Sequence, residues 1–242
     1  MTGSKAKSTK ATKAIDKVDQ LMEKASQALA STNYFDAEKL SLEALLLARK
    51  HSLFERMARI CLPLQESRRQ KRLEAIDSGR LVRLDQQSDE PRVEAGCYLF
   101  EPMLVAADAR DLRERADAAK VPVLAIAREP KNQMGLWPIA MIGPITVRTR
   151  VRPPANDEPD FAWMQSASEA LGDQAISTLD LNRPAEHIVD QILDKLGTVP
   201  EHEKLHQQLA NYCRQAEQEK LEGAEGKTEE AESDDFDDPS DV

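Results

Sequence analysis

The sequence has few aromatic residues, few glycines and no long apolar segment. Aromatic side chains make up 4% of the 242 residues, and there are nine glycines. The low aromatic content together with 31% charged residues argues against an all-β sandwich. The chain also contains no glycine-rich phosphate loop and no G-x-S-x-G nucleophile motif. The longest apolar runs, residues 121–127 and 136–142, are too short to cross a bilayer. We therefore expect a protein without a membrane span, a cofactor or an enzymatic activity.

Cysteine is also scarce. Cys61, Cys97 and Cys213 are far apart and include no C-x-x-C pair. An odd number of separated cysteines is typical of reduced, buried thiols in an intracellular protein. The N-terminus also lacks the apolar stretch of a signal peptide. We predict a cytoplasmic protein.

The net charge is concentrated at one end of the chain. The formal net charge is −10, and residues 217–242 account for all of it with twelve acidic residues and two lysines. Residues 1–13 carry four lysines and no acid. Polar segments of this kind bury too little apolar surface to offset the entropy of ordering. We predict a disordered basic arm at residues 1–13 and a disordered acidic tail at residues 217–242.

The first folded segment, residues 14–79, has a helical pattern. Apolar residues recur at three- and four-residue steps over residues 14–30, which predicts an amphipathic helix. Asn33 is a suitable N-cap for a second helix. Ser52 and Glu55 form the pattern of a capping box for a third helix, which Pro63 should kink or split.

Over residues 18–50 the first two helices resemble one tetratricopeptide repeat, a helix-turn-helix unit of 34 residues. Ala25 stands where that family has a small residue in the first helix, and Tyr34, Ala37 and Ala44 stand where the second helix packs against it. Five positions depart from the family pattern: Leu21, Lys24, Ala28, Ser41 and Arg49.

The resemblance implies that the first helix binds a protein or peptide. The residues on the corresponding face are Asp19, Met22, Ser26, Leu29 and Ala30. A single repeat leaves an apolar face that needs a neighbour. The third helix or another chain must cover it, so a homo-oligomer is compatible with the sequence.

Residues 80–154 predict a small α/β module. Apolar residues 96–105 and 121–127 flank a helical segment at 108–120, which indicates a βαβ unit. Residues 137–143 and 145–151 predict a further pair of strands. Residues 155–216 then predict a layer of three helices, at 163–179, 184–196 and from 199 to about 221. The expected fold is α+β and predominantly helical.

One strand of the module carries a basic face. Ile145, Val147, Thr149 and Val151 share one face of the strand, and Arg148, Arg150 and Arg152 share the other at intervals of about 7 Å. Such a row suits carboxylates or phosphates. The alternative is a solvated edge strand that its charges protect from aggregation. A second basic cluster on the third helix is open to the same two interpretations: Arg68, Arg69, Lys71 and Arg72.

Residues 202–206, His-Glu-Lys-Leu-His, match the H-E-x-x-H pattern of zincin metalloproteases. The resemblance would make His202 and His206 zinc ligands and Glu203 the general base. Lys204 and Pro200 depart from the family pattern, and no third ligand follows. The alternative is an ordinary helix with a buried stripe and both histidines at its rim.

The sequence as a whole favours a non-enzymatic adaptor that binds a protein or peptide partner. Two surfaces are candidates, the tetratricopeptide-like helical face and the arginine face, where an acidic partner and the acidic tail could compete. A nucleic-acid-associated factor is the alternative, less favoured because no aromatic residue accompanies the basic clusters. A zinc hydrolase is the second alternative.

Overall fold

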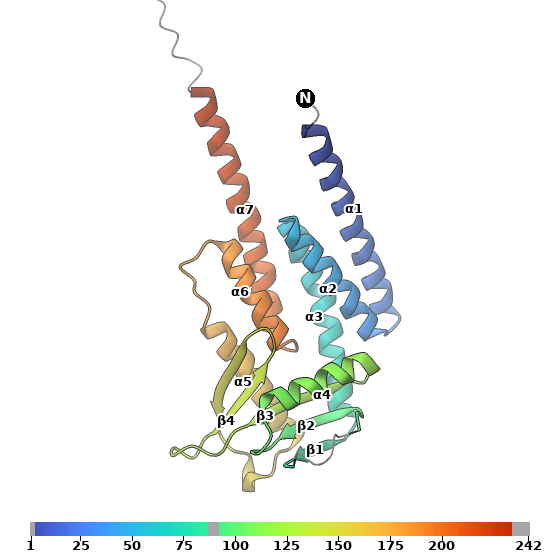
Figure 1. The fold of residues 1–242 in the computed structure, drawn as a ribbon, viewed down its shortest axis with the longest axis vertical. Helices are drawn as coiled ribbons and strands as arrows, with labels where there is room; N and C mark the ends of the chain where they lie inside the picture. The colour runs from blue at the N-terminus through green and yellow to red at the C-terminus, as the bar shows by residue number, and fades with distance from the viewer. Residues whose placement is uncertain (1–2, 87–91, 234–242) are drawn as a thin grey trace, which may run out of the picture.

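The computed structural model describes residues 3–86 and 92–233 and has an α+β fold that is predominantly helical (Figure 1). The first helices are α1 (Gly3–Ala30), α2 (Tyr34–Lys50) and α3 (Phe54–Asp77). The middle of the chain forms β1 (Leu81–Leu84), β2 (Gly96–Phe100), α4 (Ala106–Ala119), β3 (Val123–Arg128), β4 (Trp137–Ile142) and β5 (Thr146–Val151). A short 3-10 turn, η1 (Ala155–Asp157), precedes α5 (Phe161–Ser177), α6 (Ala185–Thr198) and α7 (Glu203–Ser233).

The five strands form one mixed sheet in the order β1-β2-β3-β4-β5. The strands β1, β2 and β3 are parallel, whereas β4 pairs antiparallel with β3 and with β5. The predicted βαβ unit is β2-α4-β3, and the predicted strand pair is β4-β5. Strand β1 was not predicted, because four residues that include Arg83 are too short a signal.

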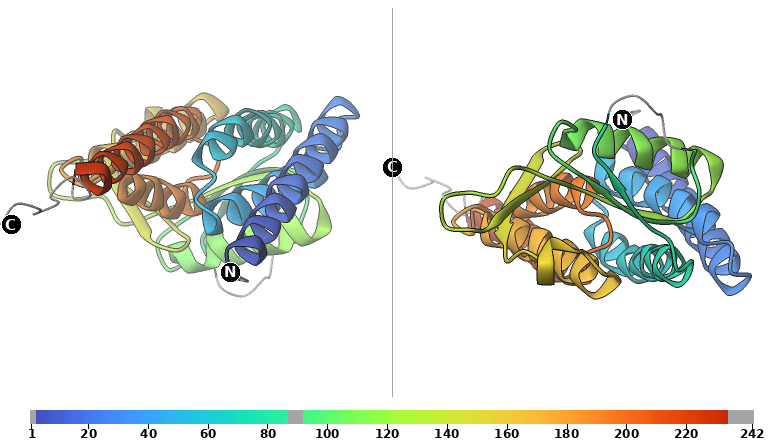
Figure 2. Two further views of the ribbon diagram at one scale, coloured as in Figure 1. Left: turned by 90° about the horizontal axis from the view of Figure 1, so that it is seen from above. Right: turned by 90° about the horizontal axis from the view of Figure 1, so that it is seen from below.

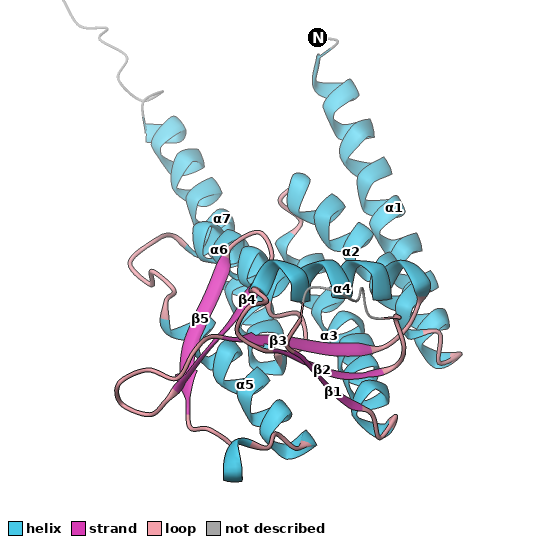
Figure 3. Ribbon diagram, turned by 60° about the horizontal axis from the view of Figure 1, so that its bottom comes forward, coloured by secondary structure: helices cyan, strands magenta, loops and turns pink. Residues whose placement is uncertain are grey.

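Helices cover both faces of the sheet. Figure 2, seen from below, shows α4 on one side and α3 and α5 on the other. Under α4 lies a small apolar cluster that includes Tyr98, Phe100 and Leu112. Figure 3 shows that α4 lies over the parallel strands, whereas β5 lies at the outer edge of the sheet.

The larger of the two apolar clusters extends through the three segments predicted as separate units. It includes Val18 and Leu45 of the N-terminal helices, Leu124 and Ile139 of the sheet, and C-terminal residues as far as Ala216. The helices α1, α2 and α3 pack in sequence, and α3 packs against both the sheet and α7. The third helix therefore does cover the N-terminal hairpin, and it does so as part of the common core.

Several predicted boundaries differ from the structure. Helix α1 begins at Gly3 and α7 continues to Ser233, so helical backbone extends into both segments expected at the ends. Helix α3 has its N-cap at Leu53 without a side-chain cap, so the predicted capping box of Ser52 is wrong. Helix α3 also continues through Pro63 and is not split there.

None of the helices in residues 3–86 and 92–233 is long and apolar enough to cross a membrane.

Candidate binding surfaces

The three arginines at the edge of the sheet lie on one exposed face, as the alternation of β5 predicted. Arg148, Arg150 and Arg152 are exposed, whereas Val147, which precedes them, is buried and Thr149 and Val151 between them are half-buried. Arg148 is 62% exposed and forms an ion pair with Glu129 at 2.6 Å. Within the described residues, the side chains of Arg150 and Arg152 have no hydrogen bond or ion pair. We call these three residues the arginine face.

The backbone of β5 is open at the same residues. Pro138 pairs with Arg150, and the Pro138 carbonyl accepts a hydrogen bond from Glu129 N–H on the β3 side at 2.8 Å. Arg150 is therefore in a non-hydrogen-bonded pair with β4, and its own N–H and C=O point to the free edge. The same register places the backbone groups of Arg148 there. Trp163 Nε1 donates to the Arg152 carbonyl at 3.0 Å and closes one end of this edge.

An apolar cavity of about 470 Å³ lies beside the arginine face, with Thr146 and Arg148 in its wall. The rest of the wall includes Leu104, Ala127, Ala140 and Ile142. At its rim Met103 is 83% exposed and Val105 is 60% exposed. Met103 has a φ of +101°, which is rare for a residue with a side chain. The sequence does not reveal this apolar cavity, because the apolar run 96–105 predicts one continuous strand, whereas β2 ends at Phe100 and a loop follows.

The predicted binding face of the first helix, now α1, is only partly accessible to a partner. Ser26 and Ala30 are exposed, and Leu29 is half-buried. Asp19 accepts two hydrogen bonds from Arg56 of α3, at 3.0 and 3.2 Å. Met22 packs against the core. Binding by this face stays a prediction, with Ser26 and Ala30 as its accessible part.

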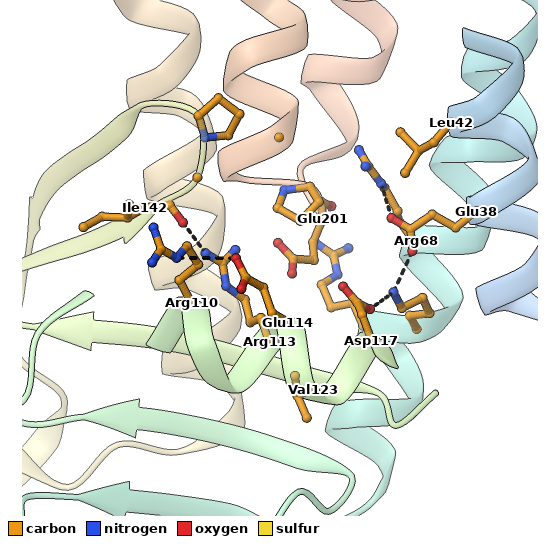
Figure 4. A pocket seen from close by; sticks show the side chains of 16 residues that line it. Glu38, Leu42, Arg68, Arg110, Arg113, Glu114, Asp117, Val123, Ile142 and Glu201 are labelled. Atoms are coloured by element: carbon orange, nitrogen blue, oxygen red, sulfur yellow. Dashed lines mark hydrogen bonds and ion pairs between the residues drawn. The ribbon is translucent and has the colours of Figure 1, made fainter. Parts of the chain in front are cut away.

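The second basic cluster is not an exposed surface. Arg68 and Arg72 are each 6% exposed, and the four basic residues form ion pairs with carboxylates. Figure 4 shows the pair between Arg68 and Glu38, whose donor–acceptor distance is 2.7 Å. Burial raises the pKa of Glu38, but Arg68 and Lys71 outweigh it, so the pKa falls to about 2. The cluster links α3 to α2, α4, α5 and α7.

A polar cavity of about 480 Å³ lies between α3, α4 and the turn that joins α6 to α7 (Figure 4). Arg113 of α4 donates to the carbonyls of Thr198 and Ile142 at 3.1 and 2.6 Å. Glu201 is 8% exposed, and its Oε2 has no hydrogen-bond partner among the described residues. Burial raises the pKa of Glu201, and Arg113 opposes that rise.

Charges of both signs line the polar cavity. It has five basic and four acidic side chains, and Arg72 is bound in addition by Glu169 and Glu203 outside it. Most of these charges form ion pairs within the chain, so the polar cavity offers few unpaired charges to an anion or a cation. We interpret it as a charge network that joins the helices.

The two histidines of residues 202–206 are buried, each 1% exposed, so their predicted position at a helix rim is wrong. His202 precedes α7 and packs against α5, where a Cβ at Gly172 would lie 2.0 Å from its Cγ. His206 Nδ1 donates to the His202 carbonyl at 3.0 Å, while Nε2 lies 3.3 Å from Arg68 Nη1. Burial and Arg68 lower the pKa of His206 to about 3.

The contacts of the His206 ring do not favour the zinc site that residues 202–206 resemble. A neutral His206 that donates through Nδ1 offers only Nε2 to a metal, and Nε2 faces a guanidinium. No group of three His, Cys, Asp or Glu residues in the described part of the chain is arranged to hold a metal ion. Cys61, Cys97 and Cys213 are free and buried, as predicted. Burial raises the pKa of the Cys61 thiol to about 12, so it stays protonated.

Comparisons with protein-family models, curated proteins and solved structures found no match to this chain.

Proposed function

We propose that this protein is a non-enzymatic, cytoplasmic adaptor that binds an extended acidic segment of a partner protein along β5. The observation that carries the proposal is that Arg150 and Arg152 are exposed without an ion pair within the described residues, on a strand whose backbone is open. A partner strand added there would form main-chain hydrogen bonds, and its alternate side chains would meet the arginines.

The arginine face explains the expected specificity. Cross-strand pairs of opposite charge each contribute about 0.2–1 kcal/mol, and like charges repel. An acidic segment is therefore favoured over a basic one at each arginine. The apolar cavity beside Arg148 adds a site for one apolar side chain of the partner. The α1 face, with Ser26 and Ala30, would be the second surface that an adaptor requires.

The nucleic-acid alternative has less support. Arg68, Lys71 and Arg72 of the second basic cluster form ion pairs with carboxylates of the same chain. These side chains are therefore not available to bind phosphates.

The test uses a synthetic peptide that alternates glutamate with threonine, titrated into the labelled full-length protein and its variants at low salt. We expect the double variant Arg150→Glu, Arg152→Glu to bind the peptide at least about tenfold more weakly, a loss of about 1.4 kcal/mol. The matched control is Arg59→Glu, Arg183→Glu, two arginines that are 60% and 63% exposed elsewhere. Equal binding by both variants would contradict the proposal.

A further inference from the structure

The acidic end of the chain carries one aromatic residue. Residues 234–238 read Asp-Asp-Phe-Asp-Asp, and Phe236 is the only aromatic residue after Tyr212. These residues follow α7 and lie outside the described part of the chain. In an extended segment Phe236 would share a face with Asp234 and Asp238. The segment thus combines acidic side chains with one apolar side chain, the two chemistries that β5 and its apolar cavity present.

Pro239 limits the length of this segment. Proline has no N–H to donate to a strand ladder, so we place the end of the pairing segment before Pro239. The five residues 234–238 are therefore the part that can pair with β5. The length agrees with that of β5, Thr146–Val151.

The described end of helix α7 lies far from β5 of the same chain. Thr198 Oγ1, at the end of α6, donates to the Ile145 carbonyl next to β5 at 3.1 Å. Since α7 begins five residues later at Glu203, its start lies near the β5 end of the sheet. From Glu203 to Ser233 the helix advances by about 45 Å, at 1.5 Å per residue. Figure 1 shows that α7 leads away from the sheet. Three further residues span at most about 11 Å, too little to bring Phe236 back.

From these observations we infer that residues 234–238 of one copy bind along β5 of a second copy, with the acidic side chains on the arginine face and Phe236 in the apolar cavity. The inference rests on the proposed function, since it names one ligand of the same surface. Each copy has both the segment and the surface, so two copies can exchange their ends reciprocally or form a longer chain. An acidic partner protein would then compete with self-association.

The experiment compares the full chain with a chain that ends at Ser233, by sedimentation equilibrium over a range of concentrations. We expect the full chain to associate as its concentration rises and the shortened chain to stay monomeric. The full-length variants Phe236→Ala and Arg150→Glu, Arg152→Glu should also stay monomeric. Phe236→Ala leaves the net charge unchanged, so it separates the apolar contribution from the electrostatic one.

A second measurement uses a labelled peptide of residues 231–242 with the chain that ends at Ser233. We expect it to bind, and the peptide with Phe236→Ala to bind about tenfold more weakly. If the glutamate–threonine peptide binds and the 231–242 peptide does not, the inference is overturned and the proposed function stands. If neither peptide binds, both fail. If the 231–242 peptide binds but the full chain is monomeric at every concentration, docking on a second copy is wrong.

Discussion

At the scale of single residues, the histidines of residues 202–206 show how position changes the meaning of a motif. The spacing is that of a zinc site, yet His202 lies outside the helix and His206 faces Arg68. The ring of His202 occupies space that Gly172 leaves empty on α5. The motif is thus part of the packing between α5, α3 and α7.

We predict that Gly172→Ala destabilises the protein by about 1–3 kcal/mol, the usual cost of overpacking a core. The new Cβ would lie 2.0 Å from Cγ of His202, whose side chain is buried. Urea unfolding followed by circular dichroism measures the change.

The matched control for this change is Gly223→Ala in α7, where a Cβ meets nothing within 4 Å. Alanine favours a helix over glycine by up to about 1 kcal/mol. The control should therefore be neutral or stabilising, and a loss of stability equal to that of Gly172→Ala would contradict the explanation.

At the scale of elements, α7 consists of two parts with different sources of stability. Its first part buries Leu205, Leu209, Cys213 and Ala216 in the core. Leu221 is 56% exposed. Between these parts, Lys220 donates to the Ser52 carbonyl and Glu219 accepts from the Ala185 N–H. Among the described residues, these are the last hydrogen bonds along α7 to residues outside the helix.

Two leucines of α7 test this division. Leu209→Ala should cost about 2–5 kcal/mol in the free energy of unfolding, since it removes a fully buried side chain. Leu221→Ala should change it by less than about 0.5 kcal/mol, as expected for an exposed position. Thermal unfolding of both variants provides the comparison, and a similar cost at the two positions would mean that α7 is packed along its whole length.

At the scale of the whole molecule, the continuous core predicts a single cooperative unfolding transition. The rings of Trp137 and Trp163 contact each other edge to face, with their centroids 5.4 Å apart. Tryptophan fluorescence therefore reports on the sheet and on α5. Circular dichroism reports mainly on the helices. Because the larger apolar cluster joins all three segments, we expect the two transitions to coincide. Three independent units would instead unfold at different urea concentrations.

Much of the architecture could be predicted from local patterns. Helical periodicity located the helices to within a few residues where they are buried, and strict alternation in β5 identified the face that holds Arg148, Arg150 and Arg152. The charge imbalance of residues 217–242 is likewise a property of the sequence alone. These features depend on neighbours along the chain, and an amino-acid sequence contains that information directly.

Only the tertiary structure decided which charged residues are free. Arg72 and Arg150 have the same side chain, yet Arg72 is buried against Glu169 and Glu203 of other helices, while Arg150 meets no described partner. The apolar cavity and the strand β1 arise in the same way from segments distant in sequence. Burial and ion pairing depend on which segments meet across the core, and no local pattern records that choice.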